Sequence, residues 1–144
     1  MEFRQLMKSD LSACAKVFIE VFNDEPWNDQ WSFEQAVNYL RQQYQTPFFL
    51  GVLAIEKEEI IGFIYGNKRI WWEGNEFYIH EFGVKKQWRG QGVGAALLDS
   101  LEKSVPEDVT SFSLLTDRGT DAEVFYQNKG FRQIDRLVFY HKSK

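Results

Sequence analysis

A glycine-rich segment between a strand-like run and a helix-like run constrains this chain more than any other feature. Residues 87–95 read Gln-Trp-Arg-Gly-Gln-Gly-Val-Gly-Ala; an apolar run, 77–84, precedes them and a run with helical spacing, 95–103, follows. A turn of this kind leaves backbone N–H groups unpaired at the positive end of the helix dipole. Glycines let an anion approach the backbone closely, and Arg89 adds a permanent cation. The segment therefore predicts a phosphate-binding turn.

Length and composition limit the class of protein. A chain of 144 residues is expected to form a single domain, spanning 1–144. The net charge of −4 argues against a nucleic-acid-binding surface. The single cysteine, Cys14, permits no intrachain disulfide and lies in an apolar helical pattern typical of a buried thiol. With no signal peptide and no run long enough to cross a membrane, the sequence predicts a cytoplasmic protein without a membrane partner.

The periodicity of apolar residues predicts a mixed α/β fold. Strands are expected at 2–6, 48–55, 60–71, 76–84, 109–116, 131–134 and 136–141. Helices are expected from the cap Ser9 to 22, from the cap Ser32 to 44, at 95–103 and at 120–128, with Gln35 at a capping-box position. The predicted architecture is a central, mostly antiparallel sheet of about seven strands with one parallel pair, flanked by about four helices.

Two motifs make the chain resemble the GNAT superfamily of N-acetyltransferases. Gln87, Gly90 and Gly92 fit the family's acetyl-CoA motif, Gln/Arg-x-x-Gly-x-Gly/Ala. Residues 122–131 fit a second signature, an Ala followed by Tyr126 and a closing Gly-Phe. The likeness in element order covers nearly the whole chain, and it implies a GNAT-like fold with a splayed parallel strand pair and acetyl-CoA as the cofactor. Parts of the chain are also similar to aminoglycoside 6'-N-acetyltransferases and polyamine acetyltransferases.

The resemblance implies where the cofactor binds. The pantetheine arm would pair with backbone in the gap between the strand ending at 84 and the strand ending near 116, and backbone amides of 89–95 would hold the pyrophosphate. The implied cofactor-binding residues are Phe82, Gly83, Val84, Gln87, Arg89, Gly90, Gln91, Gly92, Val93, Gly94, Ala95 and Tyr126. Gly119 stands where the family often has Asn, so a side-chain contact to the cofactor is missing there or is supplied by backbone.

Direct attack of an amine on a thioester needs a base, stabilisation of the carbonyl oxygen and an acid for the leaving thiolate. By resemblance, Tyr126 is the candidate general acid. Glu81, a charged residue in an apolar run, is the preferred base, acting through water, and His80 is the alternative. Strand alternation puts these two side chains on opposite faces unless a bulge intervenes. No cluster of ligands has metal-binding spacing, so no metal is expected.

An acidic and aromatic loop is the expected acceptor site, because acids and indole rings attract ammonium groups. The expected substrate-binding residues are Asp24, Glu25, Trp27, Asp29 and Trp31 of loop 23–31, with Trp72 on an opposite wall. The predicted function is transfer of an acetyl group to a primary amine of a small cationic molecule. The plain structural alternative is a solvated loop pinned by one core tryptophan.

Other functions stay open at this point. A protein or peptide N-acetyltransferase would need an open, flat groove, and a non-catalytic sensor would bind acyl-CoA without turnover. Gly90, Gly92 and Ala95 also satisfy the dinucleotide-binding fingerprint, with Asp117 beyond, but the preceding strands look antiparallel and the chain is short for a dinucleotide oxidoreductase. A homodimer is an expectation from the family alone.

Overall fold

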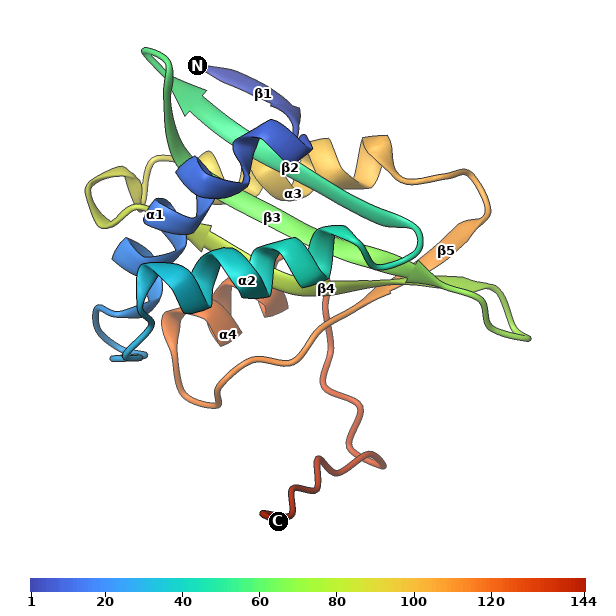
Figure 1. The fold of residues 1–144 in the computed structure, drawn as a ribbon. Helices are drawn as coiled ribbons and strands as arrows, with labels where there is room; N and C mark the ends of the chain where they lie inside the picture. The colour runs from blue at the N-terminus through green and yellow to red at the C-terminus, as the bar shows by residue number, and fades with distance from the viewer. The chain divides into compact units, whose positions relative to one another are not determined.

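The computed structural model describes all 144 residues, which divide into two compact units, Met1–Leu114 and Leu115–Lys144. The first unit holds a five-stranded sheet in the order β1-β2-β3-β4-β5 (Figure 1). The strands are β1 (Glu2–Gln5), β2 (Phe49–Glu56), β3 (Glu59–Arg69), β4 (Asn75–Val84) and β5 (Val109–Ser113). The first three pairings are antiparallel and the β4–β5 pairing is parallel, so the mixed sheet expected from the sequence is present.

Three α-helices cover the two faces of this sheet. They are α1 (Leu11–Phe22), α2 (Phe33–Tyr44) and α3 (Val93–Ser104), with short 3-10 turns η1 (Lys8–Asp10) and η2 (Lys86–Trp88). Phe63 and Tyr65 of β3 pack in one cluster with residues of α1 and α2. Gly62 faces the other way, where an added Cβ would lie 3.0 Å from Leu97 of α3. Because β3 is covered on both faces, its run from Ile60 to Gly66 is buried throughout.

Local sequence signals explain how α1 and α2 form. Ser32 Oγ accepts a hydrogen bond from the Gln35 N–H at 3.1 Å, and Gln35 Oε1 accepts from the Ser32 N–H at 2.9 Å, which confirms the capping box. In α1 the buried residues recur with helical spacing and include Cys14. Burial raises the pKa of the Cys14 thiol to about 12, so this cysteine is a core residue and not a nucleophile.

The predicted number of strands was wrong. The sheet has five strands instead of about seven, because 131–134 and 136–141 form none. Apolar alternation makes a segment able to form a strand, but a strand also needs a partner for its backbone groups. No strand pairs with these residues, and Leu137 and Phe139 are 61% and 73% exposed.

The parallel pair β4–β5 ends where β5 ends. Its ladder runs from the Asn75–Val109 pair to the Tyr78–Ser113 pair and then stops. β4 continues to Val84, six residues past its last pair with β5. The parallel pair expected from the sequence is therefore present, and β4 extends beyond it.

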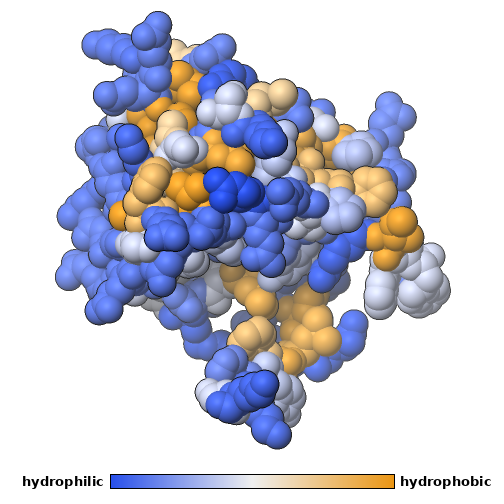
Figure 2. Space-filling model, in the orientation of Figure 1, coloured by the Kyte–Doolittle hydropathy of each residue, from blue (hydrophilic) through white to orange (hydrophobic).

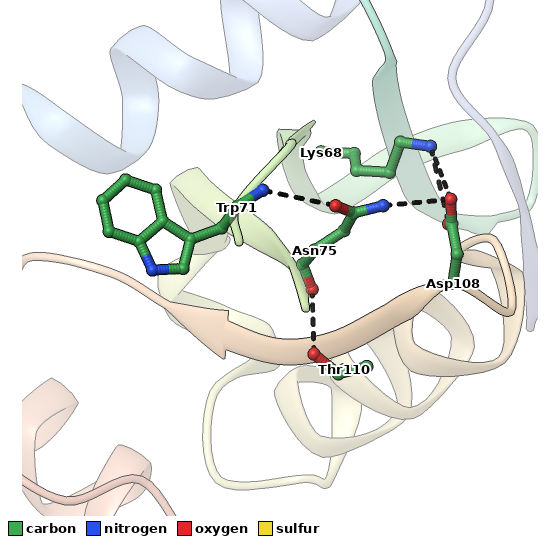
Figure 3. Close-up of polar contacts among 5 residues, drawn as sticks. All are labelled: Lys68, Trp71, Asn75, Asp108 and Thr110. Atoms are coloured by element: carbon green, nitrogen blue, oxygen red, sulfur yellow. Dashed lines mark hydrogen bonds and ion pairs between the residues drawn. The ribbon is translucent and has the colours of Figure 1, made fainter. Parts of the chain in front are cut away.

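A group of hydrogen bonds and an ion pair connects the two strands where β4 and β5 begin (Figure 3). The Asp108 carboxylate accepts from Lys68 Nζ at 3.1 Å and from Asn75 Nδ2 at 3.0 Å. Asn75 in turn accepts from the Trp71 N–H at 3.3 Å, and its carbonyl accepts from the Thr110 hydroxyl at 3.3 Å. These bonds hold β5 against the β3–β4 hairpin at this end.

The second unit contains one helix, α4 (Asp121–Asn128). The Thr120 hydroxyl caps it by accepting from the Glu123 N–H at 3.3 Å. The Tyr126 ring contacts the Phe131 ring edge-on at 5.5 Å, and the Phe131 N–H donates to the Tyr126 carbonyl at 3.0 Å. The closing turn uses Gly130 at a φ of +91°. In the whole chain, no helix combines the length and the apolar character needed to span a bilayer.

Candidate active site

A β-bulge in β4 organises the centre of the candidate site. Tyr65 of β3 pairs with Glu81, and the next residue, Gly66, pairs with Ile79, so His80 is the extra residue. A side chain at Gly66 would overlap the carbonyl of Tyr78, so the bulge requires glycine opposite it. The sequence places the two candidate bases, His80 and Glu81, on opposite faces unless a bulge intervenes. The structure contains that bulge, so the simple alternation does not apply.

The bulge turns both candidate bases toward the face covered by α1 and α2. Glu81 Oε1 accepts a hydrogen bond from the hydroxyl of Tyr39, on α2, at 2.8 Å. His80 Nε2 lies 2.6 Å from Oδ1 of Asn67, which is two residues from Tyr65 on β3 and so shares its face. The two side chains therefore lie on the same face of the sheet and not on opposite faces.

Glu81 is partly buried, and its pKa is raised to about 7. Burial is the main cause, the negative charge of Asp29 adds to it, and the hydrogen bond from Tyr39 opposes it. A carboxyl group with this pKa exchanges its proton near neutral pH. A general base that works at neutral pH requires a pKa in this range.

The surroundings of His80 favour its neutral form. Burial lowers its pKa, and the nearby positive charge of Arg69 lowers it further. The Asn67 amide nitrogen donates to the Lys68 carbonyl at 3.3 Å, so its oxygen faces His80 and accepts from Nε2–H. This arrangement leaves the lone pair on His80 Nδ1.

The expected acceptor loop forms a small acidic and aromatic wall. The Trp31 indole N–H donates to Asp29 Oδ2 at 3.0 Å, and the indole stacks on the ring of Tyr39 at 5.3 Å. Asn23 closes the loop by exchanging two hydrogen bonds of 3.0 Å with the backbone of Trp31. An open pocket of about 500 Å³ lies here, lined by Asp29, Gln30, Trp31 and Gln35.

The other loop residues predicted for the acceptor site do not line this pocket. Trp27 packs edge-on against Phe22 at 5.1 Å, and the Arg89 guanidinium lies 5.7 Å from its ring centre. Asp24 accepts from the backbone N–H of the exposed Glu25.

Trp72 is 83% exposed at the tip of the β3–β4 hairpin, which projects into solvent at the right of Figure 2. The length of β4 puts this tip roughly 20 Å from Glu81. The structure therefore does not bring Trp72 together with Asp29 and Trp31.

The glycine turn fits an anion. Gly90 and Gly92 have φ values of +73° and +84°, and a Cβ added at either would meet no atom within 4 Å. Gly92 is also the N-cap of α3, with no side chain to satisfy the first N–H groups of the helix. The turn thus combines two glycines of positive φ, open space beside them and backbone N–H groups at the start of a helix. These are the features that a pyrophosphate-binding turn requires.

The remaining predicted cofactor residues have several local roles. Gly83 is buried, and a Cβ there would lie 2.9 Å from Phe63, so this glycine permits close packing. The exposed Arg89 donates from Nε to the Val84 carbonyl at 3.0 Å. Gln91 donates to the Gln87 carbonyl at 2.9 Å, and Val93, Gly94 and Ala95 form the first turn of α3.

Three residues of the site were missed from the sequence: Tyr39, Tyr65 and Asn67. The Tyr65 hydroxyl is fully buried and lies close to that of Tyr39 without meeting hydrogen-bond geometry. The available signal was the position of Tyr39, three residues after Ala36 on the inner face of α2. A phenol on a buried helical face needs a polar partner, which points toward the charged residue in the apolar strand.

Comparisons with known proteins identify the family of the chain. The family described as "Acetyltransferase (GNAT) domain" matches residues 11–142. The chain therefore belongs to the GNAT acetyltransferase family, and it is an acyltransferase that uses acetyl-CoA. The match spans both compact units, while the expectation of a single domain stays a prediction.

Solved structures confirm the GNAT-like fold. An integron cassette protein from V. cholerae has a TM-score of 0.82 and 19% identity, over 99% of this chain and 92% of its own. An aminoglycoside N-acetyltransferase, AAC(6')-Iy, in complex with CoA has a TM-score of 0.78 and 18% identity, over 98% and 93%. An aminoglycoside acetyltransferase from an uncultured soil metagenomic sample, in complex with sisomicin, has a TM-score of 0.75 and 18% identity, over 99% of this chain and 96% of its own. No curated protein matches the sequence significantly.

Proposed function

We propose that the protein transfers the acetyl group of acetyl-CoA to a primary amine of a small cationic molecule, by direct attack. The observation that carries this proposal is the pairing of a base tuned to neutral pH with an acidic, aromatic wall. Glu81 has a pKa of about 7, and it is linked through Tyr39 to Trp31 and Asp29. Two of the similar solved structures are aminoglycoside acetyltransferases, which act on molecules of this class.

The cofactor supplies an activated acetyl thioester. The residues that would hold it are the amides of the glycine turn for the pyrophosphate and the backbone of β4 at 82–84, beyond its last pair with β5, for the pantetheine arm. Arg89 is exposed beside the turn and would add positive charge. Because the β4 contact is to backbone and the turn is glycine, these contacts depend little on side chains.

The chain's own residues handle the protons. Asp29 and the Trp31 face attract the ammonium form of the acceptor. Glu81 takes a proton from that ammonium, directly or through one water, and the neutral nitrogen then attacks the acetyl carbon. A C–N bond would form as the C–S bond breaks, and Tyr126 would supply a proton to the thiolate. The second proton lost by the acceptor nitrogen would restore the Tyr126 phenol, so that one proton in all stays on Glu81. The role of Tyr126 rests on its position in the second motif.

Thiol release from acetyl-CoA tests the proposal across polyamines, aminoglycosides, amino acids and short peptides. We expect turnover with one class of small polycation, and loss of that turnover in Glu81→Gln. Glu76→Gln, on the same strand but ion-paired with Arg69, is the matched control and keeps its activity. Turnover confined to peptides favours a peptide N-acetyltransferase, and cofactor binding without any turnover favours an acyl-CoA sensor.

A further inference from the structure

An unbroken series of contacts runs from the acidic pocket to the candidate base. Asp29 accepts from the Trp31 indole at 3.0 Å, the indole stacks on Tyr39 at 5.3 Å, and Tyr39 donates to Glu81 at 2.8 Å. The interplanar angle of 30° between Trp31 and Tyr39 is close to parallel stacking. The three contacts join α2 and the loop before it to β4, where Glu81 lies 42 residues after Tyr39.

Tyr39 is held in this position from several sides. The capping box of Ser32 and Gln35 sets the start of α2, and the fully buried Ala36 anchors the next turn. The Phe18 ring of α1 lies 5.7 Å from the Tyr39 ring, and Trp31 covers another side. A ring packed in this way has few other rotamers, so its hydroxyl is aimed at one place.

The chemistry of Tyr39 allows only one role for its hydroxyl. Burial raises the pKa of Tyr39, and the charge of Glu81 raises it further, so the phenol stays protonated. It donates to Glu81 Oε1 only, and it cannot itself be the base near neutral pH. The bond orients the carboxylate and favours its ionised form, because an ionised oxygen is the better acceptor.

The groups around Glu81 come from every neighbouring element. Tyr39 faces it from α2, Tyr65 from β3, Tyr78 from β4, and Asp29 from the loop before α2. Among these, Tyr39 is the group that donates a hydrogen bond to the carboxylate. Its hydroxyl therefore opposes burial and the charge of Asp29, both of which favour the protonated form.

We propose that Tyr39 is the positioning residue for Glu81: it fixes one carboxylate oxygen toward α2 and couples the base to the wall that binds the acceptor. The other oxygen is left to receive the proton of the amine. This inference rests on the proposed function, because it gives Tyr39 a role only if Glu81 is the base. It assigns to α2 a part in proton transfer as well as in packing.

Two measurements on Tyr39→Phe test the inference separately from the proposed function. The first follows the titration of Glu81 by carbon NMR with labelled glutamate carboxyls, which needs no acceptor, and Glu81→Gln assigns the signal. The second is the pH profile of kcat/KM. Tyr44→Phe is the matched control, because it makes the same change on the same helix where the ring packs on Phe49.

In Tyr39→Phe we expect both the Glu81 titration and the acid limb of kcat/KM to move up by about one pH unit, so that activity below the limb falls about tenfold. Tyr44→Phe should move neither. An unchanged Glu81 titration in Tyr39→Phe overturns the positioning role and leaves the proposed function standing. A titration that moves while the acid limb stays in place shows that Glu81 is not the base, and it overturns both proposals.

Discussion

Replacement of Glu81 by glutamine should stabilise the protein and inactivate it. The ordinary pKa of glutamate is 4.5, and in the folded protein that of Glu81 is about 7. The folded state therefore holds this proton more tightly than the unfolded state does, and stability is lost as the pH rises from 4.5 through 7. The difference between the two pKa values corresponds to about 3 kcal/mol of unfolding free energy above pH 7. Glutamine stays neutral and can still accept from Tyr39.

Urea unfolding of the wild type and Glu81→Gln between pH 4.5 and 8 measures this effect. The two free energies of unfolding should agree near pH 4.5 and diverge to about 3 kcal/mol in favour of the variant at pH 8. Glu76→Gln, on the same strand and ion-paired with Arg69, is the matched control for the loss of a carboxylate from β4. A difference between wild type and Glu81→Gln that is the same at every pH would refute the reasoning, because it would mean that burial does not perturb the ionisation of Glu81.

Three further substitutions follow from the same contacts. Asp29→Asn removes a negative charge that raises the pKa of Glu81, so the acid limb of kcat/KM should move to lower pH while KM for cationic acceptors rises; an acid limb that moves up instead would contradict this electrostatic sign. Gly92→Ala puts a Cβ on a residue with a φ of +84°, so calorimetry should show weaker acetyl-CoA binding and urea unfolding a loss of about 1–2 kcal/mol. Tyr65→Phe removes a buried hydroxyl without a hydrogen-bond partner, so the free energy of unfolding should rise by about 1 kcal/mol; a fall of that size would reveal a partner.

The features that could be read from the sequence are those encoded locally. The Ser32–Gln35 capping box, the glycine turn before α3 and the buried thiol of Cys14 each depend on a few neighbouring residues. The failed strands at 131–141 show the opposite case. Their alternation of apolar residues is genuine, but a strand exists only with a pairing edge, and the pattern within a segment does not say whether that edge is available.

The positions of His80 and Glu81 show why the geometry of the site could not be predicted without knowledge of the strand pairing. Two adjacent strand residues point to opposite faces by default, and only the pairing of Tyr65 with Glu81 and of Gly66 with Ile79 reveals the extra residue between them. The sequence contains the enabling glycine, but Gly66 is one of several glycines and nothing near it indicates a bulge. The tuned pKa of Glu81 then follows from partners in α2 and in the loop before it. The chemistry of this residue is thus set by contacts across 42 positions of sequence, which no local pattern describes.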